Sequence, residues 1–192
     1  MRFINSSYIL AIPLLFVSSA FAQRQTFSVT PASSAVSFTL GDVLHTVHGS
    51  FHVQSGTVEF NTSPLTMSGS IVVAAGSGMS GSETRDRKMA AEILEATRFA
   101  EVSFSPKGYQ GTIAAQGDST VQVSGTFTLH GAAHELAVPM QIHIEGGNCT
   151  AKTHFAVPYV KWGLKDPSTF ILRVAKEVEI DLSLVGRLIP AS

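Results

Sequence analysis

The chain has 192 residues, with 13 basic and 14 acidic side chains, so its formal net charge is −1. With so even a balance and no basic block, we expect neither nucleic acid nor an anionic membrane surface to be a partner. Hydrophobic residues make up 44% of the chain and charged residues only 14%, so a large apolar area must be buried.

A short apolar segment near the N-terminus is typical of a secretory signal peptide. Arg2 precedes the apolar residues 8–17, and Ala20-Phe21-Ala22 gives the small-x-small pattern that signal peptidase recognises. The apolar run is too short to span a bilayer comfortably, so we expect no stable membrane insertion. We therefore expect a cleaved signal peptide over residues 1–22, a mature domain over residues 23–192, and a periplasmic or secreted location.

Beyond residue 23, apolar and polar residues alternate over short runs that end at Gly, Ser, Pro or Asn. This pattern is typical of half-buried antiparallel strands. The predicted strands span residues 26–30, 35–40, 44–53, 57–61, 65–75, 100–105, 109–115, 119–130, 135–145, 150–157 and 170–186.

Residues 85–96 break this alternation. Met89, Ile93 and Ala96 lie at helical spacing among good helix formers, and Ser82 is the expected N-cap. The sequence therefore predicts one amphipathic helix inserted between strands.

Many strands and one helix in a single domain fit an all-β sandwich or a closed barrel. The longer predicted strands are long for a sandwich of this size, and closure of a barrel removes exposed sheet edges. We therefore predict an extended antiparallel β-barrel with one inserted α-helix. Such a barrel holds either its own side chains or one elongated ligand, and composition does not decide between them.

The histidines do not form a recognisable metal site. His45, His48 and His52 lie in a strand pattern, in which His48 and His52 share one face about 13 Å apart and His45 points to the other. Zinc ligands must all lie about 2 Å from one ion, so this spacing excludes a shared zinc. His130 and His134 flank a turn, where we expect them to be solvated.

The sequence also lacks a recognisable catalytic arrangement. It contains no Gly-x-Ser-x-Gly elbow, and Glu177, Glu179 and Asp181 alternate with apolar residues, which indicates a solvated stripe. Cys149, the only cysteine, excludes an intrachain disulfide and is expected to be an inert small side chain. We therefore expect no enzymatic activity, no metal and no cofactor.

Apolar and aromatic side chains on the predicted inner faces are the candidate ligand-binding residues. Few polar groups accompany them, so such an interior suits an apolar ligand better than an aqueous substrate. The charged start of the helix fits salt-bridged pairs on its surface, and it also allows Arg85 or Lys88 to lie at the barrel mouth near a polar head group. The candidate residues are Phe38, Val47, Phe51, Phe104, Phe127, Met140, Phe155, Trp162 and, for the head group, Arg85.

Several short motifs follow one another along the mature chain: SAVSF at 34–38, HTVHGSF at 45–51, GTVEF at 56–60, SETRDRKM at 82–89, FAEVSF at 99–104, VSGTFTLHG at 123–131 and VEIDL at 178–182. In their order and spacing they resemble the YceI family of exported lipid-binding proteins. The resemblance implies a lipocalin-like barrel with a tubular cavity for a polyisoprenoid or fatty chain. Two segments, residues 97–99 and 165–169, depart from the commoner family pattern.

We therefore expect binding, storage or transport of a long apolar lipid in the bacterial periplasm. A polyisoprenoid, an isoprenoid quinone and a fatty-acid derivative all fit this expectation. Two alternatives stay open, namely a barrel enzyme that acts on a lipid in the same cavity, and a ligand-free stress or structural protein of the envelope. The formation of a homodimer also stays open.

Overall fold

In the computed structural model, the described residues are 24–41, 46–169 and 173–190. The expected signal peptide, residues 1–22, and His45 lie outside them. Within them, no helix combines the length and the apolar character that crossing a bilayer requires.

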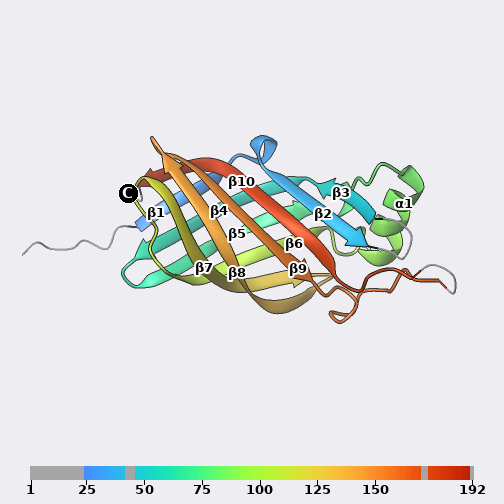
Figure 1. The fold of residues 1–192 in the computed structure, drawn as a ribbon. Coiled ribbons are helices and arrows are strands. Elements are labelled where there is room, and N and C mark those ends of the chain that lie inside the picture. The colour runs from blue at the N-terminus through green and yellow to red at the C-terminus, as the bar shows by residue number, and fades with distance from the viewer. Residues whose placement is uncertain (1–23, 42–45, 170–172, 191–192) are drawn as a thin grey trace, which may run out of the picture.

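The described residues form one antiparallel sheet that curls into an elongated barrel (Figure 1). Neighbouring strands in the sheet follow the order β1-β4-β5-β6-β7-β8-β9-β10-β2-β3, and β1 also pairs with β10. The strands are β1 (Arg24–Val29), β2 (Ala35–Gly41), β3 (Thr46–Phe51), β4 (Val53–Thr62), β5 (Leu65–Ala74), β6 (Glu101–Gln110), β7 (Gly117–Leu129), β8 (Ala132–Glu145), β9 (Asn148–Val157) and β10 (Val178–Pro190).

The barrel closes because β1 pairs with β4 on one side and with β10 on the other. A short 3-10 turn, η1 (Pro31–Ser33), separates β1 from β2, and both strands pair with β10. Only His52 separates β3 from β4. β1 and β2 are therefore two segments of one bent strand, and β3 and β4 are two segments of another. Counted in this way, the closed barrel has eight strands.

The inner face of the ring is the hydrophobic core. Along β8, buried Val138, Met140, Ile142 and Ile144 alternate with exposed residues, as expected for strands with one face inside. The predicted all-β antiparallel barrel is thus confirmed.

A glycine allows β10 to meet β1. At Gly186, which pairs with Val29, an added Cβ would lie only 2.1 Å from the carbonyl oxygen of Ser28. A larger residue would force the two strands apart, so the absence of a side chain at this position permits closure.

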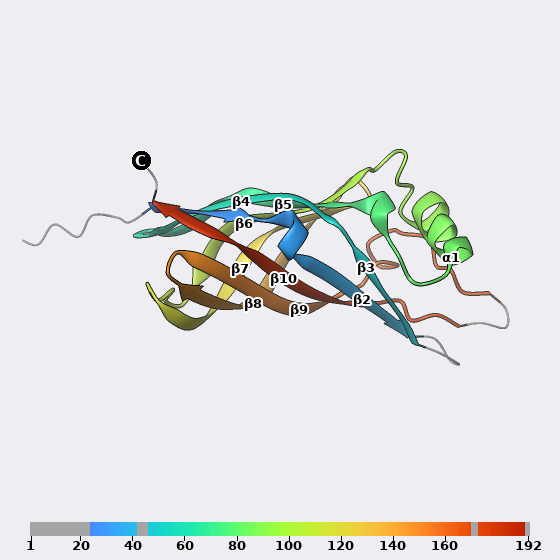
Figure 2. The same cartoon turned by 90° about the horizontal axis from the view of Figure 1, so that it is seen from above.

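The predicted helix is present, but its bounds and type differ. It consists of α1 (Glu83–Lys88) followed by a π-helical turn, η3 (Met89–Ile93), in which the Leu94 N–H donates to the Met89 carbonyl at 2.9 Å. Ser82 is at the N-cap, but its side chain makes no capping hydrogen bond. Figures 1 and 2 show α1 at one end of the barrel, which we call the α1 end.

Several predicted strand boundaries are wrong. The gap predicted between the runs 44–53 and 57–61 lies inside β4, which is continuous from Val53 to Thr62. The runs 100–105 and 109–115 are one strand, β6, which bends at an irregularity between Pro106 and Gly108 and ends at Gln110. In the run 170–186, residues 170–172 lie outside the described residues, and the regular strand β10 begins at Val178.

Hydrogen bonds to other segments explain the late start of β10. The Ala175 N–H donates to the Gly41 carbonyl at 2.8 Å, and the Ala175 carbonyl accepts from the Tyr159 hydroxyl at 2.7 Å. Residues 173–177 are therefore held by individual hydrogen bonds and not by regular strand pairing. The local alternation of side chains does not reveal this difference.

Candidate functional site

The barrel encloses a cavity of about 600 Å³, lined by side chains from every strand. This volume is within the range of about 300–1,000 Å³ that is usual for small-molecule sites. Among the described strand residues that line it, only Ser103 and Thr153 carry polar side chains. The interior is therefore suited to hydrocarbon.

Polar lining residues gather at the α1 end, on the segment between β5 and β6. They are Ser80, Ser82, Thr84, Arg85 and Lys88. The polar side chains of the helical segment and of the residues before it therefore form a rim at one end of an otherwise apolar tube.

Arg85 is held in place at this rim. Its Nε donates to the Ser80 hydroxyl at 2.6 Å, and its Nη2 donates to the Ser80 carbonyl at 2.7 Å. Asp86 accepts hydrogen bonds from both the backbone N–H and the hydroxyl of Ser80. The guanidinium is thereby fixed beside the cavity.

The structure brings most of the predicted site residues together. Arg85 lines the rim, and the residues that line the apolar wall are Phe38, Val47, Phe51, Phe104, Phe127, Met140 and Phe155. Within the wall, Phe38 packs against Phe51 with ring centroids 5.4 Å apart, and Phe127 meets Phe155 edge-on at 6.2 Å. These seven wall residues come from six different strands, which closure of the barrel brings around one cavity.

Trp162, which was predicted to bind ligand and to lie among the strands, is placed differently from the other candidates. The chain turns tightly after β9, where the Trp162 N–H donates to the Pro158 carbonyl at 3.0 Å, so Trp162 is not on a strand. Its ring packs behind Phe127, with centroids 5.7 Å apart, and does not line the cavity.

The expectation that His130 and His134 are solvated is wrong. Phe99 covers His130, with ring centroids 4.3 Å apart, and Trp162 covers His134. The Nε2 atoms of both histidines are buried without a hydrogen-bond partner, although the His130 Nε2 lies 3.4 Å from a Glu95 carboxylate oxygen. The covering side chains come from irregular segments, so the turn sequence alone did not indicate them.

Sequence reasoning missed two groups of lining residues. Tyr159 and Leu164 are buried against the cavity from the segment after β9, which has no periodic pattern to reveal them. Met89, Ile93 and Leu94 line it from the helical segment, and their helical spacing was the available signal.

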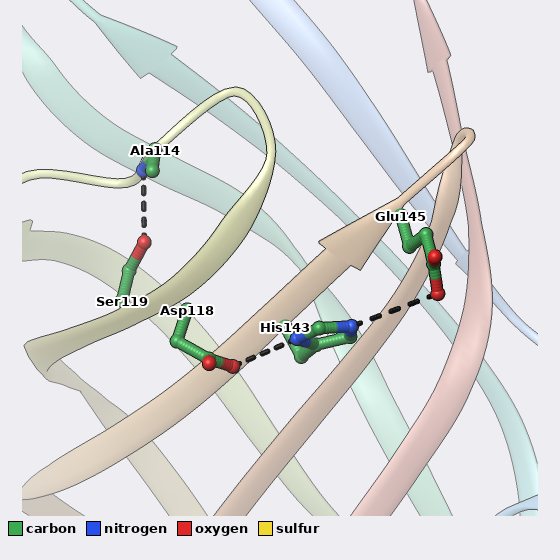
Figure 3. Close-up of polar contacts among 5 residues, drawn as sticks. All are labelled: Ala114, Asp118, Ser119, His143 and Glu145. Carbon is green, nitrogen blue, oxygen red and sulfur yellow. Dashed lines mark hydrogen bonds and ion pairs between the residues drawn. The ribbon is translucent and has the colours of Figure 1, made fainter.

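Other titratable clusters lie on the outer wall. Figure 3 shows His143 between Asp118, whose carboxylate oxygen is 2.7 Å from Nδ1, and Glu145 at 4.0 Å from Nε2. His154 is similarly paired with Asp181 and Glu179 on β10. All of these side chains are largely exposed, and none of them lines the cavity.

His48 and Cys149, which the sequence analysis considered for metal binding and reactivity, also lie outside the cavity lining. His48 is exposed, with Nδ1 3.0 Å from the Thr39 hydroxyl. In the described part of the chain, no three His, Cys, Asp or Glu side chains are grouped as metal ligands. Cys149 is buried, and desolvation raises the pKa of its thiol to about 11, so the unreactive protonated form predominates at neutral pH.

Comparison with known protein families identifies the domain to which this barrel belongs. The YceI-like domain matches residues 27–186. This chain belongs to the YceI-like family. The resemblance stated from its motifs is thus confirmed, and the YceI-like domain coincides with the barrel.

Solved structures share the fold of this YceI-like chain. BcnA of Burkholderia cenocepacia is 20% identical with a TM-score of 0.66, over 82% of this chain and 99% of that one. A polyisoprenoid binding domain from Saccharophagus degradans is 13% identical with a TM-score of 0.65, over 84% and 97%. The YCEI protein of Campylobacter jejuni is 12% identical with a TM-score of 0.61, over 75% and 86%. No curated protein gives a significant sequence match.

Proposed function

We propose that this YceI-like protein binds a long apolar lipid inside its barrel, with the hydrocarbon chain along the cavity. The observation that carries the proposal is a cavity of about 600 Å³ whose strand-borne lining is apolar except for Ser103 and Thr153. Burial of hydrocarbon contributes about 25 cal/mol per Å², so a long chain can be held tightly with few hydrogen bonds. Binding without bond chemistry is the activity that such an interior supports best.

Family and fold support the same ligand class. The Saccharophagus degradans neighbour is described as a polyisoprenoid binding domain. A polyisoprenoid, an isoprenoid quinone and a fatty-acid derivative all offer the long apolar chain that the wall accepts. The aromatic wall, with Phe38, Phe51, Phe104, Phe127 and Phe155, supplies the contact area.

We place the ligand's head group at the α1 end, next to Arg85 and Lys88. Arg85 is already fixed by Ser80, so it loses little side-chain freedom when it meets a polar group. Trp162 has an indirect role in this proposal, because it supports Phe127 from behind.

Storage or transport in the periplasm is the proposed biological role, following cleavage of residues 1–22. Cell fractionation of a tagged full-length chain should find the processed protein in the periplasm or the medium. A homodimer stays a prediction, which sedimentation of the purified protein with and without lipid would test.

The lipid content of the protein tests the proposal directly. Protein purified without detergent should release lipid into an organic extract, and mass spectrometry should identify it at near one molecule per chain. Delipidated protein should take up an added polyisoprenoid or fatty acid. An empty extract together with no uptake of either probe would overturn lipid binding, and chemically altered lipid after incubation would favour an enzyme.

A further inference from the structure

Thr153, in the middle of β9, differs from the rest of the cavity wall. Among the described residues it is the one buried Ser, Thr, Asn, Gln, His or charged residue, with 8% of its surface exposed. Its side chain faces the cavity, and its Oγ1 is buried without a hydrogen-bond partner.

The surroundings of this hydroxyl are apolar. Leu182 is its partner across the β9–β10 pair, and Ala151 and Phe155 flank it on the same face of β9. None of these side chains can accept or donate a hydrogen bond. These neighbours therefore leave the hydroxyl of Thr153 without a partner.

A buried hydroxyl without a partner destabilises a folded protein. Valine fills nearly the same space without that cost, and the same wall uses valine at positions 123, 138 and 157. The threonine is thus unfavourable for the empty barrel, and a polar group brought in by the ligand would remove the penalty.

We propose that the Thr153 hydroxyl forms a hydrogen bond with an oxygen atom located part-way along the chain of the bound lipid. This inference rests on the proposed function. The cavity then prefers a lipid with a hydroxyl or carbonyl part-way along its chain over an unsubstituted hydrocarbon chain. A threonine hydroxyl both donates and accepts, so it can pair with either group.

The position of Thr153 sets where that oxygen lies. Thr153 is four residues before Val157, the last residue of β9 at the α1 end, which corresponds to about 13 Å along the strand. The contact is therefore well inside the tube and separate from the rim at Arg85.

A series of fatty acids tests the inference. Stearic acid and monohydroxystearic acids with the hydroxyl at successive positions are titrated calorimetrically into the delipidated protein. One position in the series should bind about 10-fold more tightly than stearic acid, the gain of about one hydrogen bond. Thr153→Val should abolish this preference and leave the affinity for stearic acid equal or higher.

Thr150→Val is the matched control, because Thr150 is on the same strand with its side chain on the outer wall. It should keep the preference for the hydroxylated chain. Without lipid, Thr153→Val should melt at the same or a higher temperature than the parent protein, because no internal hydrogen bond is lost.

The outcomes separate the inference from the proposed function. Binding of stearic acid with no positional preference, or a preference that survives Thr153→Val, would overturn the role of Thr153 and leave lipid binding intact. A clearly lower melting temperature of unliganded Thr153→Val would also overturn it, since the hydroxyl would then have a partner within the protein. Failure of every fatty acid and isoprenoid to bind would overturn the proposed function and the inference with it.

Discussion

The imidazole ring of His134 lies parallel to the indole ring of Trp162, with centroids 4.1 Å apart and planes inclined by 6°. His134 is near the start of β8, whereas Trp162 belongs to the irregular segment after β9. Trp162 also packs against Phe127 of the cavity wall. The stacked pair therefore fixes this segment against the barrel at the α1 end.

His134→Ala should release Trp162. Loss of the stack removes about 1 kcal/mol of stability and exposes the indole to water. Trp162 is the only tryptophan, so the tryptophan emission reports on the surroundings of this one side chain. Its emission should move to longer wavelength and become easier to quench with acrylamide. His143→Ala, on the outer wall, is the control and should leave the emission unchanged. If His134→Ala also left the emission unchanged, the packing of Trp162 on His134 would be contradicted.

Ala151→Phe should shorten the cavity. Ala151 is buried and lines the cavity, so a benzyl group at this position enters the space that a lipid chain would occupy. Affinity for a long-chain fatty acid should fall at least 10-fold, about 1.4 kcal/mol, and affinity for a short one should fall less. The measurement is displacement of a bound fluorescent fatty acid.

The control for this variant is Ala137→Phe, which adds the same group to an exposed position on β8. It should bind lipid as the parent protein does. Equal affinities of all three proteins would place the lipid elsewhere on the molecule.

Stability should decrease in alkaline solution because of Cys149. Burial raises the pKa of its thiol from the ordinary 9.0 to about 11. Between these values the unfolded chain has lost the proton and the folded chain retains it, so unfolding becomes easier as pH rises. Urea titrations from pH 8 to 11 should show this decline, and Cys149→Ala should flatten it. A decline of equal slope in both proteins would assign it to other groups, such as Tyr159, whose pKa is raised to about 12 by burial.

His154 should titrate above its ordinary range. The hydrogen bond to Asp181 is the largest cause of its raised pKa, and the charges of Asp181 and Glu179 add to it against the opposing effect of desolvation. Because the folded pKa exceeds the unfolded value, the ion pair stabilises the protein fully below about pH 6.5, and this contribution is lost as pH rises through the folded pKa.

NMR of the imidazole carbon-bound protons measures this titration. Asp181→Asn should lower the pKa of His154 more than Glu179→Gln does, and Asp118→Asn, on a different strand pair, should leave it unchanged. An equal response to all three substitutions would show that general surface charge, not the Asp181 hydrogen bond, controls the titration.

Period-two alternation, together with the length of the alternating runs, was sufficient to predict the all-β barrel and its apolar inner face. It also placed Phe38, Val47 and Phe127 on the cavity side, because each is within a regular strand whose faces differ in polarity. Alternation did not predict that β1 and β2 form one bent strand, because this depends on the pairing of both segments with β10.

The errors about side-chain packing involve irregular segments. Phe99 and Trp162 follow no repeat, so their packing against His130 and His134 depends on turns that only the folded chain defines. The unpartnered hydroxyl of Thr153 was equally hidden. Alternation indicates which way a side chain faces, but the absence of a partner depends on residues from other strands.

The role of β10 in closing the ring has a consequence for how the chain folds. β10 follows the other nine strands in sequence, and it is the neighbour of β9 on one side and of both β1 and β2 on the other. An emerging chain can therefore build its hairpins from β3 to β9 early, but the two edges of that open sheet stay unpaired until the last segment arrives. A nascent chain that lacks β10 would therefore expose the apolar inner face of the sheet to solvent, so burial of the core is completed only when the last strand has been made.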